Sequence, residues 1–121
     1  MDQYKLGEME RKFAEIIWAN EPVSSRTLTE LCEKDFAWKR TTTYTMLKRL
    51  CERKIFQNNH GTVTALMTEN EFKAAQGEQF LTDVFDGSLP QFLAAFTRRK
   101  KLSSKEIDEI QHLIDEHREE E

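Results

Sequence analysis

The apolar positions in the first third of the chain recur with the 3.6-residue period of an α-helix. A first apolar stripe consists of Met9, Phe13, Ile16 and Ile17. Asn20 and Pro22 are expected to end this helix, because proline disfavours the α conformation in the residue before it. Ser24 or Ser25 can then N-cap a second, short helix. Its apolar face would be formed by Leu28, Leu31 and Cys32. The pattern breaks over residues 34–36.

The segment from Trp38 to Lys54 predicts a third helix with two chemically opposite faces. One face carries Thr43, Leu47, Leu50 and Cys51. The opposite face carries Thr41, Thr42, Thr45, Lys48, Arg49 and Glu52. A merely solvated helix would more often interleave Glu and Lys at i,i+4 spacing. Two consecutive helices, the second presenting a polar face to solvent, predict a helix-turn-helix.

After Lys54 the period changes to that of extended chain. Residues 55–57 begin an extended run, residues 58–61 have the composition of a turn, and Thr62–Met67 alternates threonine with apolar residues. This predicts a two-stranded hairpin with a polar tip, in which Gly61 can supply a positive φ. Three helices followed by a hairpin describe a winged helix-turn-helix domain, which we place at residues 1–70.

The second half, residues 71–121, predicts three further helices. Thr68–Glu71 and Ser103–Glu106 each match a capping box, Ser88 begins another helix, and Asp86–Gly87 separates two of them. Their apolar stripes are too large to leave in water and too few to enclose a core. We therefore expect a helical dimerisation segment, in a mostly α protein. The residues expected at the dimer interface are Phe80, Leu81, Val84, Phe85, Leu89, Phe92, Leu93, Phe96, Ile107, Ile110, Leu113 and Ile114. The alternative is a compact extension that folds against its own winged helix.

The polar face of the third predicted helix suits nucleic acid. Short hydroxyl side chains let a helix approach a base edge closely, and Lys or Arg neutralises phosphate charge. We predict that this helix enters a DNA major groove; an ordinary threonine-rich amphipathic helix is the alternative. The wing would lie beside a phosphate backbone, with Asn58, Asn59 and His60 as candidate contacts. His60 is otherwise a solvated turn residue.

The net charge of −4 is unevenly distributed along the chain. Residues 1–70 hold 11 Lys and Arg against 10 Asp and Glu, a net charge of +1, whereas residues 71–121 hold 7 against 12, a net charge of −5. Between Trp38 and Lys54, Glu52 is the only acid. The six cations of that segment are Lys39, Arg40, Lys48, Arg49, Arg53 and Lys54. Positive charge is therefore concentrated at the proposed DNA face, and its local placement matters more than the overall charge.

The sequence gives little support for an enzyme, a metal-binding protein or a membrane protein. Cys32 and Cys51 fall on predicted apolar faces and, without a nearby His, complete no metal-ligand set. No His, Cys, Asp or Glu constellation has catalytic spacing, and no Gly-rich phosphate loop appears among four glycines. We therefore expect no enzyme, no metal and no cofactor.

No apolar run approaches the ~20 residues needed to span a bilayer. No signal-peptide core follows MDQYK. We expect a cytoplasmic protein with no membrane partner.

Several motifs in this chain are similar to those of one known family. They are EIIW (Glu15–Trp18), VSSRTL (Val23–Leu28), TTTYTMLKRLCERKIF (Thr41–Phe56), FLTDVFDGSLPQFLAAF (Phe80–Phe96) and LSSKEIDEIQHLI (Leu102–Ile114). The combination of T-x-x-x-L-x-R-L with F-x-G-S and S-x-x-E-I-x-E-I is specific, although any one motif alone is weak. By these motifs the chain resembles the penicillinase-repressor family, which includes the BlaI, MecI and CopY repressors.

The resemblance implies a homodimeric winged-helix repressor that binds a dyad operator, often with TACA/TGTA half-sites. It places base contacts on Thr41, Thr42, Tyr44 and Thr45, and directs Lys48 and Arg49 toward phosphates. Tyr44 stands where some β-lactam-responsive members carry Arg, which implies a different base preference at that position.

The resemblance also bears on how such a repressor is released. The β-lactam-responsive members are cleaved at an Asn-Phe bond in the penultimate helix, and Ala95–Phe96 is the matching bond here. This makes it a candidate cleavage site for a signalling protease. The copper-sensing members end in a C-x-C cluster, whereas this chain has no cysteine after Cys51. A winged-helix protein–protein adaptor without sequence-specific DNA binding is the rival functional hypothesis.

Overall fold

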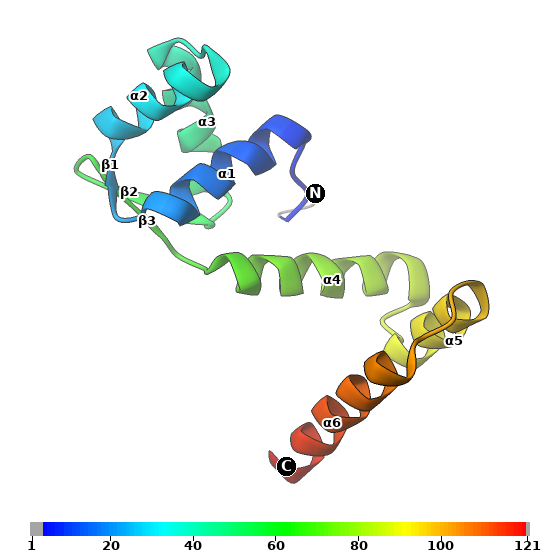
Figure 1. The fold of residues 1–121 in the computed structure, drawn as a ribbon. Coiled ribbons are helices and arrows are strands. Elements are labelled where there is room, and N and C mark those ends of the chain that lie inside the picture. Colours follow the sequence, from blue (N-terminus) through cyan, green and yellow to red (C-terminus); the bar gives the residue numbers. More distant parts are fainter. Residues whose placement is uncertain (1–3, 121) are drawn as a thin grey trace. The chain divides into compact units, whose positions relative to one another are not determined.

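The computed structural model describes residues 4–120 (Figure 1). In chain order its elements are α1 (Glu8–Asn20), β1 (Val23–Ser24), α2 (Ser25–Phe36), α3 (Arg40–Glu52), β2 (Phe56–Asn59), β3 (Thr62–Ala65), α4 (Glu69–Phe85), α5 (Leu89–Arg99) and α6 (Ser104–Glu120). The chain separates into two compact units, the first ending at Gln79 and the second beginning at Phe80. The mostly α, winged-helix fold class is confirmed, and each unit is described by itself below.

The predicted end of the first helix and start of the second are confirmed. α1 ends at Asn20, and the Ser24 hydroxyl caps α2 by accepting a hydrogen bond from the Thr27 amide at 3.0 Å. The expected break at residues 34–36 is wrong, because α2 continues to Phe36. Ala37, with a φ of 56°, ends the helix instead. The longer helix lets the Phe36 ring pack against Trp38, with ring centroids 5.0 Å apart.

The wing is a small antiparallel sheet with strand order β1-β3-β2. Phe56 pairs with Ala65 and Asn59 with Thr62, so the hairpin turn consists of two residues, His60 and Gly61. Both have positive φ, 52° and 94°. A tight type I′ hairpin requires this conformation at both turn residues. Residues 58 and 59, expected in the turn, therefore belong to β2. The sequence also missed β1, a two-residue strand that pairs with β3.

The core of the first unit lies between α1, α2, α3 and the sheet. Its fully buried members include Phe13, Ile17, Leu28, Leu50, Ile55, Phe56 and Val63. Cys32 is also fully buried, and burial raises the pKa of its thiol to about 11. Burial likewise raises the pKa of Cys51. Burial therefore favours the neutral form of both thiols, consistent with the small core residues predicted from the sequence.

Phe72 belongs to this core, although the sequence pattern grouped it with the apolar stripes of the second half. Its side chain is 2% exposed, and its ring lies 5.4 Å from that of Trp18 and 5.9 Å from that of Tyr4. The Trp18 indole also donates a hydrogen bond to the Met67 carbonyl at 3.0 Å. The start of α4 is thus packed on α1, and the first unit extends past residue 70.

The second unit holds the last turns of α4 together with α5 and α6. The predicted helix boundaries are confirmed: Ser88 caps α5 through the Gln91 amide at 3.1 Å, and Ser103 and Glu106 form a capping box before α6. Four phenylalanine rings, Phe80, Phe85, Phe92 and Phe96, pack edge-on or tilted at 5.5–6.0 Å. No residue described in α5 or α6 is fully buried. The unit therefore leaves much of its apolar surface accessible.

Candidate nucleic-acid interface

Helix α3 has the two faces that its sequence predicts. Thr43, Leu47 and Leu50 are 3% exposed or less and anchor the helix to the core. The side chains on the opposite face are all exposed: Thr41, Thr42, Thr45, Lys48, Arg49 and Glu52. The buried residues fix the orientation of α3 on the core, so the polar face points away from the core. A helix with a polar outward face can be inserted into a groove without reorganising the fold.

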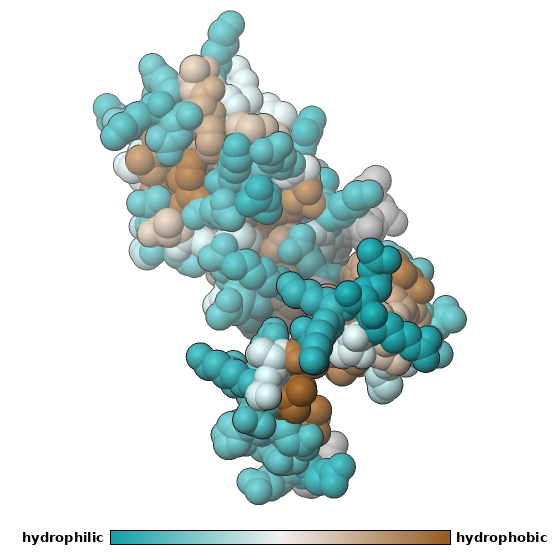
Figure 2. All heavy atoms as spheres, turned by 45° about the vertical axis from the view of Figure 1, so that its right-hand side comes forward, coloured by the Kyte–Doolittle hydropathy of each residue, from teal (hydrophilic) through white to brown (hydrophobic). Residues whose placement is uncertain are grey.

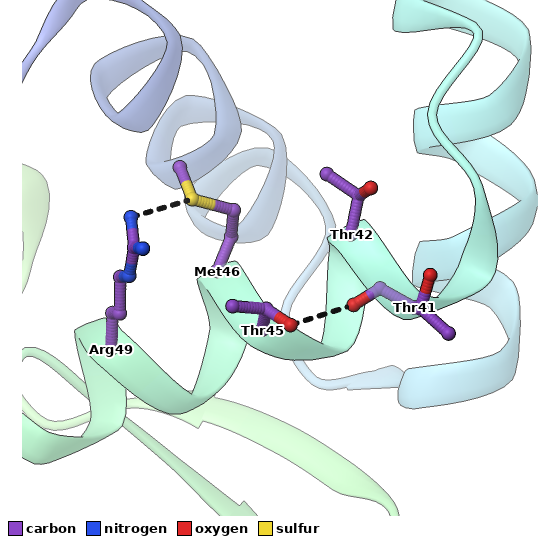
Figure 3. A pocket seen from close by; sticks show the side chains of 5 residues that line it. All are labelled: Thr41, Thr42, Thr45, Met46 and Arg49. Atoms are coloured by element: carbon purple, nitrogen blue, oxygen red, sulfur yellow. Dashed lines mark hydrogen bonds between the residues drawn. The ribbon is translucent and has the colours of Figure 1, made fainter.

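A shallow hollow of about 270 Å³ lies along one side of α3. It is lined by Thr41, Thr42, Thr45, Met46 and Arg49 (Figure 3). The Thr45 hydroxyl donates to the Thr41 carbonyl at 2.9 Å, so its oxygen remains able to accept a hydrogen bond from a ligand. The Arg49 guanidinium lies 3.8 Å from the Met46 sulfur, so it stands at the rim of the hollow. Four of the five lining residues belong to the predicted DNA face; Met46 was missed.

Tyr44 lies against the start of α2 rather than within the hollow. Its hydroxyl donates to the Ser25 hydroxyl over 3.4 Å, and the Ser25 amide donates to the Gly61 carbonyl at 2.8 Å. Tyr44 is 40% exposed, so it remains partly accessible to a ligand. Ser25 therefore connects α3 with the turn of the wing, a link that was not predicted from the sequence.

The remaining candidate contacts flank α3 or lie on the wing. Lys39 is the N-cap residue of α3, its side chain makes no capping hydrogen bond, and Arg40 is the first residue of the helix. Both are exposed. Asn59 ends β2 and His60 stands at the wing turn, also exposed. The hollow, the N-terminal end of α3 and the wing tip are all accessible in the same unit.

Arg53 is a cation that the sequence analysis counted with the DNA face. In the structure its guanidinium pairs with Glu10 at 3.6 Å and donates to the Lys5 carbonyl at 2.8 Å. The two side chains of the ion pair are only 28% and 18% exposed. Arg53 therefore ties the end of α3 to the segment before α1, and its charge is offset locally.

Replacing Arg53 with methionine is expected to lower the free energy of unfolding by roughly 1–3 kcal/mol, because a charged hydrogen-bond donor is removed. The salt dependence of DNA binding should stay unchanged, since the guanidinium neutralises no phosphate. Denaturant unfolding and binding titrations at several salt concentrations measure the two effects. Lys48→Met is the matched control, with the opposite pattern. A shallower salt slope for Arg53→Met would place Arg53 on the DNA after all.

The predicted dimerisation residues form accessible surface in the last turns of α4 and in α5 and α6. Seven of them are large apolar side chains at least 38% exposed: Phe80, Val84, Leu89, Phe96, Ile107, Leu113 and Ile114. Five are half-buried: Leu81, Phe85, Phe92, Leu93 and Ile110. Apolar side chains, coloured brown, reach the surface between hydrophilic ones in Figure 2. The Ala95–Phe96 bond lies inside α5, with both side chains exposed.

Two other features are absent from residues 4–120: a metal-ligand cluster and a membrane-spanning helix. Within that range no three His, Cys, Asp or Glu side chains come together as metal ligands would. Nor does any helix there have the length and apolar character that crossing a membrane requires. His112 pairs with Glu116 at 2.7 Å on the surface of α6. Residues at i,i+4 spacing on a helix surface commonly contact each other in this way.

The chain is similar to known proteins over nearly its whole length. The family model described as penicillinase repressor matches residues 6–116. The penicillinase repressor of Bacillus licheniformis is 24% identical over 119 residues, 94% of this chain and 92% of that protein. The methicillin resistance regulatory protein MecI of Mammaliicoccus sciuri is 23% identical over 120 residues, 92% of this chain and 94% of that protein. Because the family model spans nearly the whole chain, the chain belongs to the penicillinase repressor family, whose members are DNA-binding transcriptional regulators and not enzymes.

Proposed function

We propose that this repressor acts as a homodimer on a palindromic operator, with α3 of each protomer in a major groove. The observation that carries the proposal is α3 itself: hydroxyl and cationic side chains project from a helix whose other face is anchored in the core. Two such helices would enter successive grooves about 34–36 Å apart on one face of the duplex. Occupation of a promoter dyad would then exclude RNA polymerase.

The distribution of charge supports separate roles along the interface. Thr41, Thr42 and Thr45 carry short hydroxyls that can reach base edges, and we assign them, with Tyr44, to base recognition. Lys39, Arg40, Lys48 and Arg49 supply charge for the phosphates, and Asn59 and His60 contact the backbone beside the wing. Phosphate contacts release counterions, so binding should weaken steeply as salt is added.

The exposed apolar surface of the second unit supports the homodimer. Val84 and Leu113 are 59% and 64% exposed. Side chains of this kind would each gain from burial against a second copy. A two-fold axis brings the same patch of both protomers together, so one self-complementary surface is sufficient. We assign dimerisation to this unit and DNA binding to the first one, with α4 running from one to the other.

We propose that an inducing signal releases the operator by damaging the dimer interface, and a signalling protease acting at Ala95–Phe96 is one such route. The bond lies within α5, so a protease must first unwind part of that helix to bind it as an extended chain. Cleavage would separate Phe92 from Phe96, whose rings lie 5.6 Å apart, and so remove part of the aromatic cluster. The two winged-helix units of the former dimer would then bind their half-sites independently and weakly.

Thr42→Ala and Lys48→Ala are expected to weaken binding in different ways. Loss of the Thr42 hydroxyl should relax base preference at one position of each half-site, because a base contact carries sequence information. Loss of the Lys48 ammonium should weaken all sequences alike and reduce the salt slope by about 1 for each phosphate interaction removed. Titrations of an operator and its single-base variants at several salt concentrations distinguish the two. Equal losses on every sequence from both changes would contradict the assignment of roles.

An adaptor role, in which the winged helix binds protein instead of DNA, makes the opposite prediction for charge reversal. The variant with both Lys48→Glu and Arg49→Glu should abolish repression of a reporter gene if α3 binds DNA. Unchanged regulation by this variant would favour the adaptor.

A further inference from the structure

We propose that the hollow beside α3 binds the C5-methyl group of a thymine, with Met46 as its apolar floor. This inference rests on the proposed DNA-binding function and adds a specificity-determining residue to it. Met46 was not part of the predicted interface, because an apolar side chain is typical of a core residue. In the structure it is half-buried, the least exposed of the five residues that line the hollow (Figure 3).

The lining residues share one side of the helix. Thr42, Thr45, Met46 and Arg49 are spaced i, i+3, i+4 and i+7. This spacing places side chains one above another along a helix. Met46 also packs against the core of the first unit, so its position is supported from below. The floor of the hollow therefore moves little relative to the polar face above it.

The chemistry of the hollow is apolar at the floor and polar at the rim. Each threonine of the wall contributes a methyl group as well as a hydroxyl, and the Met46 thioether is soft and unbranched, so it adapts to irregular shapes. The Arg49 guanidinium lies 3.8 Å from the Met46 sulfur. It has five N–H donors, so it can face a phosphate and still donate a hydrogen bond to a base beside the hollow. A ligand that fits must present an apolar group beside a hydrogen-bond acceptor.

Thymine meets this requirement in the major groove. It is the standard base that displays a methyl group there, and its O4 atom is an acceptor. Cytosine lacks the methyl and presents an amino donor at the same place, which would face the donors of Arg49. The hollow should consequently favour thymine over cytosine by two independent contacts, one apolar and one polar.

The test removes the methyl group alone. After selection of a bound duplex by the full-length protein, each thymine is replaced in turn by deoxyuridine, which keeps every hydrogen bond of the pair. One thymine per half-site is expected to be sensitive, with a loss of affinity of about four-fold for one half-site and about fifteen-fold for both, the effect of one buried carbon group. In Met46→Ala this sensitivity should nearly vanish, because the floor is missing.

Two further variants guard against a folding defect. Met46→Leu keeps the apolar volume and should keep the uracil sensitivity, whereas Met46→Gln keeps the length but not the apolar character and should lose most of it. Leu66→Ala, an exposed apolar residue outside the hollow, is the matched control and should leave the sensitivity intact. Binding without any uracil-sensitive position, or equal sensitivity in wild type and Met46→Gln, overturns the thymine pocket. Failure to bind any duplex overturns the proposed function instead.

Discussion

Replacing Ile114 with lysine is expected to convert the proposed homodimer into monomers and to weaken operator binding by at least about 100-fold. Ile114 is 47% exposed in α6, so the change costs the isolated protomer little. In a two-fold dimer the substitution occurs twice, and each ammonium would be buried without a partner at a cost of several kcal/mol. Sedimentation and operator titration of the same preparation measure both losses.

His112→Lys is the matched control for this prediction. It also places an ammonium on α6, on the face opposite Ile114, where it can pair with Glu116, the residue that His112 contacts in the wild type. This variant should remain dimeric and should bind the operator as the wild type does. A dimeric Ile114→Lys protein would exclude this stripe of α6 from the interface. A monomeric protein with unchanged operator affinity would show that dimerisation does not contribute to DNA binding.

The elements of the first unit were largely predictable because they depend on local chemistry. Ser24 caps α2 and Thr68 begins α4 through hydrogen bonds to residues three positions away. Short sequence motifs specify such bonds. The two faces of α3 follow from its period alone. The strand β1 could not be found in this way, since two residues carry no periodicity and their pairing partner, β3, follows only after two intervening helices.

The candidate site was predictable in outline and incomplete in detail for the same reason. Composition identified the cations near α3, but the pairing of Arg53 with Glu10 depends on how α1 and α3 fold together. Met46 fits a core position because it is apolar, and only the structure places it at the edge of a hollow. The type of a residue indicates whether it can be buried or exposed. Whether it is buried in this protein depends on the tertiary packing around it.

The position of Phe72 also depends on tertiary packing, and it affects where the boundary between the two units lies. A helical stripe shows which face of α4 is apolar but not which surface covers it, and the sequence assigned the whole helix to the dimerisation segment. Phe72 instead lies against Trp18 and Tyr4, whose backbone carbonyl accepts a hydrogen bond from Gln76 at 3.0 Å. We therefore propose that the boundary between the two units lies within α4.

Phe72→Ala in the full-length protein is expected to destabilise the first unit by about 3–5 kcal/mol, because it removes a fully buried ring and leaves a cavity beside Trp18. The midpoint of thermal unfolding should fall by at least ~10 °C for a unit of this size. Tryptophan fluorescence measures it, since both tryptophans of the chain, Trp18 and Trp38, lie in the first unit.

The same fluorescence transition tests where α4 divides. Lys73→Ala is the control for Phe72→Ala. Lys73 follows Phe72 in α4 but is exposed, and its removal breaks only a surface ion pair with Glu69. Such a change should shift the free energy of unfolding by less than about 0.5 kcal/mol. Phe80→Ala removes a ring that packs on Phe85 and Phe92 in the second unit, so the tryptophan transition should not move. If Phe72→Ala behaved like Phe80→Ala, the winged helix would be stable without α4 and the boundary would lie near residue 70. If only Phe72→Ala lowers the free energy of unfolding strongly, the first turns of α4 are part of the DNA-binding unit. A change in these turns would then affect the core on which α3 packs.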